Sequence, residues 1–249
     1  MGELYIVGTP IGNLEDITLR ALETLKKVDY IACEDTRQTL KLLSHYNIHK
    51  PLVSCHANDE LKASRKIVSL LAGGASVAYC SDAGTPGLSD PGAVLAREAR
   101  REGYRVVPIP GPSAFAALIS VAGFGGRSVL FDGFPSPKAS RRKTRLAELL
   151  AREEAFVLYE SPYRIAKLMR ELAILAPERE VCIGREMTKL HEDIRTGTAC
   201  ELAALFEAES SGTSLQESPI PARGEFAILV SGRENQAGLP EDECSQGRD

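Results

Sequence analysis

The sequence of 249 residues lacks long apolar runs and closely paired cysteines. No apolar run approaches the ~18 residues that a transmembrane helix needs. The first residues also lack the charged segment and apolar core of a secretion signal. The six cysteines form no C-x-x-C pair, which favours buried free thiols in a reducing compartment. We therefore expect a cytoplasmic protein without a membrane span.

Complete metal and nucleotide motifs are missing as well. His45 and His49 have one half of a zinc-like spacing, with Cys55 and His56 nearby, but no C-x-x-C completes it. We expect no metal site. The sequence has no G-x-x-x-x-G-K-[ST], no G-x-G-x-x-G and no G-x-S-x-G motif. Its glycine-rich turns are therefore not expected to bind a triphosphate or pyrophosphate.

Strand-like and helix-like segments alternate along the chain. In the first ~115 residues, strands are expected over 4–7, 30–33, 76–80 and 105–109, with a helix capped by Asp16 and helices over 36–44 and 59–71. The pattern restarts after Gly123–Gly126, with strands over 128–134, 156–159, 181–184 and 224–230 and helices over 141–152, 162–175 and 198–209. The prediction is an α/β fold of two α/β domains, 1–122 and 123–232, with a disordered tail over 233–249 and a ligand cleft between the domains.

The segment Ser81–Gly92 is the strongest candidate for a ligand site. It follows an apolar strand, precedes a helix, and sets polar side chains among three glycines and two prolines. Open α/β sheets bind ligands at such strand ends. An ordinary connection rich in turn formers is the alternative, but the segment is long for one. Asp82 offers a carboxylate acceptor, and Ala83, Gly84 and Ala114 leave room for a ring or ribose.

Positive charge is local, because the net charge is −4. Five cations within eight residues, with no acid among them, favour RNA phosphates over a solvated helix face: Lys138, Arg141, Arg142, Lys143 and Arg145. Arg37, Arg164, Arg185 and Lys189 lie beside turns and are candidates for the same cleft. Each is equally well explained by a structural ion pair with Glu34, Glu160 or Glu186.

Several of these segments together resemble the RsmI family. They are Gly8–Leu14, Asp16–Leu22, Glu34–Arg37, Ser81–Gly92, Pro110–Ala114, Tyr159–Arg164 and Gly184–Lys189, in that order. The family contains S-adenosylmethionine-dependent 16S rRNA (cytidine-2′-O)-methyltransferases of the tetrapyrrole methylase superfamily. The resemblance implies that the cofactor lies in the cleft, that the protein is a homodimer, and that it methylates a decoding-centre cytidine of the small subunit.

The resemblance also implies which residues contact the cofactor: Pro10, Asp82, Ala83, Gly84, Thr85, Leu88, Ser113, Ala114 and Tyr159. Turn geometry and packing explain Pro10 and Leu88 equally well. A group must accept the proton of the ribose hydroxyl, and the candidates are Glu34, Asp35, Glu186 and Lys189. None is singled out by the sequence. The cations of the RNA site would be Arg37, Arg164, Arg185 and the five of 138–145.

The chain departs from the family pattern at its end. Family members often continue into a small basic domain, whereas here an acidic segment, Glu241–Glu243, is found. How RNA is held without that extension, and why Asp132 and the 210–222 segment are present, are left open. Two alternatives remain: a methyltransferase of the same superfamily that acts on a tetrapyrrole or a protein, and a non-catalytic RNA-binding assembly factor.

Overall fold

The computed structural model describes residues 2–55, 60–211 and 218–233. It divides the chain into two compact units: Met1–Ala117 with Arg185–Asp193, and Leu118–Gly184 with Ile194–Asp249. The expected domain limits, 1–122 and 123–232, stay a prediction, and one helix spans the division near residue 117. The predictions for His56, for residues 212–217 of the 210–222 segment and for the tail beyond residue 233 fall outside the described residues.

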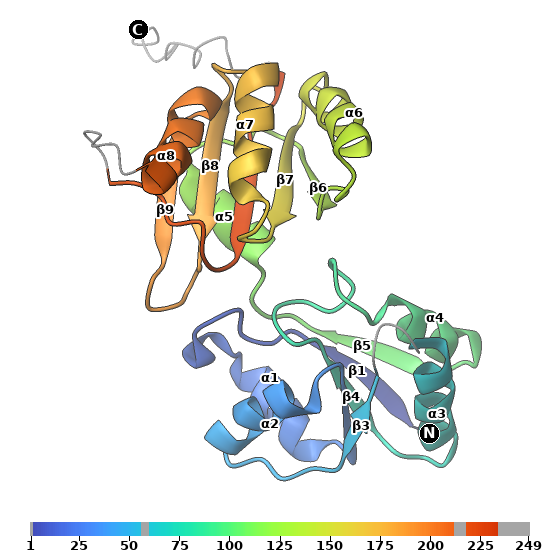
Figure 1. Ribbon diagram of the computed structural model, residues 1–249. Coiled ribbons are helices and arrows are strands. Elements are labelled where there is room, and N and C mark those ends of the chain that lie inside the picture. The colour runs from blue at the N-terminus through green and yellow to red at the C-terminus, as the bar shows by residue number, and fades with distance from the viewer. Residues whose placement is uncertain (1, 56–59, 212–217, 234–249) are drawn as a thin grey trace, which may run out of the picture. The chain divides into compact units, whose positions relative to one another are not determined.

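The first unit is a parallel sheet covered on both faces (Figure 1). The strand order is β3-β2-β4-β1-β5, and every neighbouring pair is parallel. The strands are β1 (Glu3–Val7), β2 (Tyr30–Cys33), β3 (Leu52–Ser54), β4 (Val77–Cys80) and β5 (Arg105–Ile109). The helices are α1 (Leu19–Lys27), α2 (Thr36–His45), α3 (Glu60–Ala72) and α4 (Ala93–Arg101).

The two faces of this sheet carry separate cores because side chains alternate along each strand. Ala78 and Cys80 of β4 pack with residues of α1 and α2. Val77 and Tyr79 pack with residues of α3 and α4. The helix that follows β1 therefore covers one face, and the helix that follows β4 covers the other. Such a divergence between neighbouring parallel strands opens a crevice at their carboxyl ends.

The second unit has a mixed sheet of order β6-β7-β10-β8-β9. Its strands are β6 (Val129–Gly133), β7 (Ala155–Glu160), β8 (Glu180–Arg185), β9 (Asp193–Thr198) and β10 (Phe226–Val230), with β6 parallel and β10 antiparallel to β7. Helices α6 (Ala139–Leu150), α7 (Ile165–Leu175) and α8 (Ala199–Ser211) contribute to its main core. Helix α5 (Ala114–Ala122) lies on the opposite face (Figure 1). None of the helices in the described part of the chain has the length and apolar character needed to cross a bilayer.

One local prediction is wrong, and two strands were not predicted. Asp16 does not cap α1: it ends a short 3₁₀ turn, and the Thr18 hydroxyl accepts from the Ala21 amide instead. Strand β3 is only three residues long, which is too short for a periodic signal. Strand β9 has a polar sequence, Asp193–Thr198, and lies at the sheet edge, so it carries no apolar run.

The long loop after β4 is fixed by its glycines and by a distant carboxylate. Gly84, Gly87 and Gly92 all have positive φ. Glu60 of α3 accepts hydrogen bonds from the amides of Gly92 and Val94, at 2.8 and 3.2 Å, and so caps α4. A Cβ on Gly92 would lie 2.8 Å from Cε1 of buried Tyr79. Position 92 therefore accepts only glycine without rearrangement.

Gly92→Ala is expected to lower the free energy of unfolding by at least about 2 kcal/mol, from backbone strain together with displacement of the Tyr79 ring. Gly74→Ala is the matched control, because Gly74 also has positive φ but a Cβ there meets nothing within 4 Å. Chemical denaturation should show a loss of about 1 kcal/mol or less for the control. Equal losses for the two variants would contradict this account of the loop.

Candidate functional site

Three turns meet at the carboxyl edge of the first sheet. Thr9, after β1, exchanges two backbone hydrogen bonds with Gly84, after β4, at 2.9 and 3.0 Å. The Thr85 hydroxyl donates to the carbonyl of Pro112, after β5, at 3.2 Å. The adjacent strands β4, β1 and β5 thus present one connected surface, which contains most of the predicted cofactor residues.

Glycine is required where two of these turns touch. A Cβ on Gly8 would lie 2.8 Å from the Cα of Gly111, and one on Gly111 would lie 2.7 Å from the carbonyl oxygen of Gly8. The backbones therefore pack directly on each other. Pro10 is half-buried beside this contact, and Leu88 is half-buried with its amide donating to the Thr85 carbonyl.

Asp82 and Asp35 link the loop to the start of α2. The carboxylate of Asp82 accepts a hydrogen bond from the Asp35 amide at 2.9 Å. Asp35 in turn caps α2 and accepts from the backbone and guanidinium of Arg37. These hydrogen bonds lower the pKa of Asp35 to about 2. The Arg37 side chain is largely exposed but paired with Asp35.

A cavity of about 550 Å³ lies in the first unit beside the turn after β5. Its walls come from residues 110–113, together with Ile11, Asp16, Thr18 and Thr188. The Ser113 hydroxyl is buried and has no hydrogen-bond partner among the described residues. An unpaired buried hydroxyl is costly and is often explained by an absent ligand or water. Ala114, the next predicted cofactor residue, begins α5.

The segment Arg185–Asp193 belongs to the first unit although it connects two strands of the second. The Thr188 hydroxyl accepts a hydrogen bond from the Asn13 amide at 3.0 Å. A side chain at position 12 would collide with Thr188 and Lys189, so Gly12 allows this segment to pack closely on the first turn. Glu186 and Thr188 have φ of 48° and 64°. Non-glycine residues in this region cost about 1–3 kcal/mol each and concentrate at functional sites. The Lys189 ammonium lies 2.9 Å from the Glu186 carboxylate.

Glu34 and Arg185, two further predicted site residues, are both half-buried. Arg185 donates to the carbonyl of His191 at 3.1 Å within the same segment. Tyr159, the last predicted cofactor residue, lies in the second unit. Its ring packs edge-on against Phe131 and Phe134, with centroids 4.9 and 5.7 Å apart.

The structure separates the predicted RNA-binding cations of the second unit into two groups. The prediction that Arg142 binds RNA is wrong. Its side chain is only 3% exposed, and the guanidinium forms a bidentate pair with Glu171 at 2.7 and 2.8 Å. Arg145 pairs with Asp132 at 2.6 Å and with Glu148 at 2.9 Å, which accounts for Asp132. Arg164 pairs with buried Glu160 at 2.7 Å. All three arginines are therefore engaged in ion pairs within the second unit.

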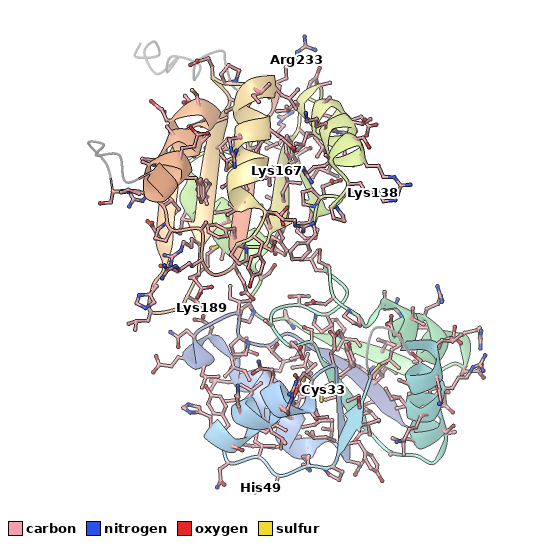
Figure 2. All side chains as sticks on the ribbon, in the orientation of Figure 1. Cys33, His49, Lys138, Lys167, Lys189 and Arg233 are labelled. Carbon is pink, nitrogen blue, oxygen red and sulfur yellow. The ribbon has the colours of Figure 1, made fainter. Side chains whose placement is uncertain are left out.

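The remaining predicted cations of this segment are solvent-exposed: Lys138, Arg141 and Lys143. Figure 2 shows Lys138 at the start of α6, pointing away from the ribbon. Three exposed cations on the first turns of one helix can still contact phosphates. Among the described side chains, no group of three or more His, Cys, Asp or Glu residues gathers as a metal site would require.

Comparison with known proteins places the chain in a family. The family model for Tetrapyrrole (Corrin/Porphyrin) Methylases matches residues 3–203. A protein of Borrelia garinii subsp. bavariensis named Ribosomal RNA small subunit methyltransferase I is 50% identical over 92% of this chain and 98% of its own length. The chain belongs to this methyltransferase I family. The member from Thermotoga maritima is 44% identical over 94% of this chain and 100% of its own length.

Solved structures of tetrapyrrole methylases share the fold of this family member. The methyltransferase CobJ matches with a TM-score of 0.67 over 94% of this chain and 95% of its own, at 19% identity. Diphthine synthase matches with a TM-score of 0.64 over 93% of this chain and 90% of its own, at 13% identity. The predicted α/β fold of tetrapyrrole methylase type is therefore confirmed.

Sequence reasoning missed several residues that line the cavity of this family member. Ile11, Asp16 and Thr18 lie within segments that carry the family resemblance, but of these only Asp16 is predicted to have a role, as a helix cap. Thr188 lies in another of these segments, Gly184–Lys189, far along the chain from the first turn. Only its hydrogen bond to Asn13 reveals that it belongs beside the first turn. No local pattern contains that information.

The buried pair Arg142–Glu171 gives a sharp test of its structural role. Glu171→Leu leaves a buried guanidinium unpaired and is expected to cost about 3–5 kcal/mol of unfolding free energy. The double variant Arg142→Met/Glu171→Leu should recover most of this loss, as measured by urea denaturation at neutral pH. A double variant as unstable as the single one would contradict this interpretation.

The same pair predicts a pH dependence. Hydrogen bonds from Arg142 lower the pKa of Glu171 in the folded state. A depressed folded-state pKa adds stability above the unfolded value of about 4.3, and this stability is lost as pH falls toward the folded value. Below about pH 4, the difference in stability between wild type and the double variant should therefore shrink. A difference that does not change with pH would show that the pair is not ionised.

Proposed function

We propose that this protein transfers a methyl group from S-adenosylmethionine to the ribose 2′-hydroxyl of a decoding-centre cytidine in 16S rRNA. The supporting observation is the family membership: relatives named for methylation of small subunit ribosomal RNA match almost the whole of both chains. The tetrapyrrole methylases to which they belong use S-adenosylmethionine. The cytidine and the 2′-oxygen rest on the resemblance of the motifs.

The edge of the first sheet fits a nucleoside cofactor. The backbones of Gly8 and Gly111 are in direct contact, so no side chain separates the turns after β1 and β5. The exposed carboxylate of Asp82 offers an acceptor for hydroxyl or amino groups. The unpaired Ser113 hydroxyl beside the cavity offers one further polar contact. We propose Pro10, Asp82–Thr85, Leu88, Ser113 and Ala114 as cofactor contacts, with Tyr159 contributed by the second unit.

When bound, S-adenosylmethionine supplies an electrophilic methyl group on a sulfonium. The ribose hydroxyl would receive this methyl group, and a base of the protein would accept the hydroxyl proton. Because the donor is already activated, the chain contributes mainly alignment. The rigid turns after β1, β4 and β5 serve that purpose, since each is hydrogen-bonded to a neighbour.

The four candidate bases are not equivalent. Asp35 has a pKa near 2 because Arg37 and two amides stabilise its charge, so it accepts a proton poorly near neutral pH. Glu186 and Lys189 belong to the strained turn whose Thr188 lines the cavity. We propose that proton transfer involves Glu186 and Lys189, with Glu34 as the remaining candidate.

The RNA would be held by the exposed cations Lys138, Arg141 and Lys143, supported by Arg37, Arg164 and Arg185 where their ion pairs can open.

We further propose that the protein acts as a homodimer in the cytoplasm, where its ribosomal substrate is found. A monomer in sedimentation experiments would contradict the first of these statements.

The proposal is tested by incubating purified protein with methyl-labelled donor and small ribosomal subunits that lack the modification. We expect label in one cytidine of 16S rRNA, at the ribose, mapped by nuclease digestion and mass spectrometry. Free tetrapyrroles and total ribosomal protein serve as competing acceptors in parallel. Label in either acceptor and none in RNA would overturn the proposal.

Replacement of the candidate bases should separate their roles. Glu186→Gln is expected to lower kcat by about 10²-fold or more, as loss of a positioned base does, with little change in donor affinity. Asp35→Asn is the control, since asparagine preserves the helix cap and the Asp35 carboxylate is a poor base. Its kcat should stay within a few-fold of wild type in the same labelling assay. The reverse order would exclude the Glu186 assignment.

A further inference from the structure

We propose that Phe134 and Tyr163 form a surface on which unpaired bases of the RNA substrate stack. The inference deepens the proposed function and rests on it, because it assigns how the second unit binds RNA. The two residues and the neighbouring exposed cations, Lys138 and Arg141, are called the stacking surface below. The partner is single-stranded RNA.

Both aromatic side chains are more exposed to solvent than is usual for large apolar residues. Phe134 is 55% exposed and Tyr163 is 95% exposed. Phe134 directly follows β6, and Tyr163 follows β7 by three residues. Because β6 and β7 are parallel neighbours, these residues leave the sheet at the same edge.

The Phe134 ring is positioned by a row of aromatic contacts. Phe134 packs edge-on against Tyr159, with ring centroids 5.7 Å apart and planes inclined by 69°. Tyr159 packs in the same way against Phe131, at 4.9 Å. An edge-on neighbour supports one side of a ring and leaves a face available, and bases stack on such faces.

The loop that carries Phe134 is held by two arginines. Arg142 donates to the carbonyls of Ser136 and Pro137, at 3.1 and 3.2 Å, and Arg164 donates to the carbonyl of Pro135 at 3.5 Å. Each arginine is fixed by a buried carboxylate, Glu171 and Glu160 respectively. A loop fixed in advance loses little entropy on binding, so its contacts translate more fully into affinity.

One atom of this support is unsatisfied. Oε2 of Glu160 is buried and has no hydrogen-bond partner among the described residues, while Oε1 accepts from Ser161 and Arg164. Such groups destabilise a fold and call for an explanation. Burial of Glu160 therefore lowers the stability of the fold, but it fixes the position of Arg164. Arg164 in turn fixes the Phe134 loop through the Pro135 carbonyl.

The charge beside the aromatic rings favours RNA over an apolar partner. Lys138 and Arg141 lie just after the Phe134 loop, and Lys143 follows, all three exposed. Aromatic rings beside a row of cations are the usual composition of single-strand binding grooves, where bases stack and phosphates meet the charges. A tetrapyrrole or an apolar peptide would gain little from the cations.

The sequence contains no tryptophan, so a single introduced indole reports on its own surroundings. Phe134→Trp keeps an aromatic face at the stacking surface. Ile174→Trp is the matched control, because Ile174 is 80% exposed and lies at the opposite end of α7 from Tyr163. Both full-length variants are titrated with a short oligocytidylate and with a blunt RNA duplex of equal length.

We expect oligocytidylate to quench the fluorescence of Phe134→Trp but not that of Ile174→Trp, and the duplex to quench neither. Phe134→Ala and Tyr163→Ala should each weaken oligocytidylate binding by about tenfold in an anisotropy assay. Tyr163→Ala should leave the Tm unchanged because its ring is almost fully exposed, whereas Phe134→Ala also removes the contact with Tyr159 and should lower the Tm slightly. Absence of selective quenching, whether or not the oligonucleotide binds, overturns the inference. Normal methylation of small subunits alongside that result would leave the proposed function standing, whereas selective quenching without any methylation would overturn the function alone.

Discussion

The pair of backbone hydrogen bonds between Thr9 and Gly84 is the constraint on which the candidate site depends. It joins the turns after β1 and β4, which are neighbouring parallel strands whose helices cover opposite faces. The third turn, after β5, is added by direct contact between Gly8 and Gly111. Larger side chains at these glycines would separate the turns. The polar groups of the site are therefore positioned by backbone, not by side-chain packing.

In the second unit, burial distinguishes cations that look alike in the sequence. Arg142 and Lys143 are adjacent, yet one is paired with Glu171 in the interior and the other is exposed. Arg145 forms an ion pair with Asp132. A helix has one buried side, so a continuous basic run cannot serve a single function. Arg142 and Arg145 form ion pairs within the second unit, whereas Lys138, Arg141 and Lys143 remain exposed to solvent.

Much of the fold could be predicted, because it depends on local signals. Apolar strands such as Tyr30–Cys33 and Arg105–Ile109 were located at their observed limits, and the α/β class followed from alternation with helices. Strands β3 and β9 could not be found, since one is too short and the other too polar to show a pattern. The cap by Glu60 and the contact of Thr188 with Asn13 join residues distant in sequence. Only tertiary packing determines such pairs, whereas the turns themselves were visible from their glycines and prolines.

The segment Arg185–Asp193 has a consequence for the order in which the protein forms. It belongs to the first unit but is synthesised after most of the second. Domains generally fold as they emerge from the ribosome, amino-terminal first. Here the sheet of residues 1–117 can assemble early, but Thr188 reaches Asn13 only once the chain has been made beyond residue 188. One wall of the cavity is therefore added late in translation, so the nascent amino-terminal half exists for a time with its turns in place and its pocket unfinished.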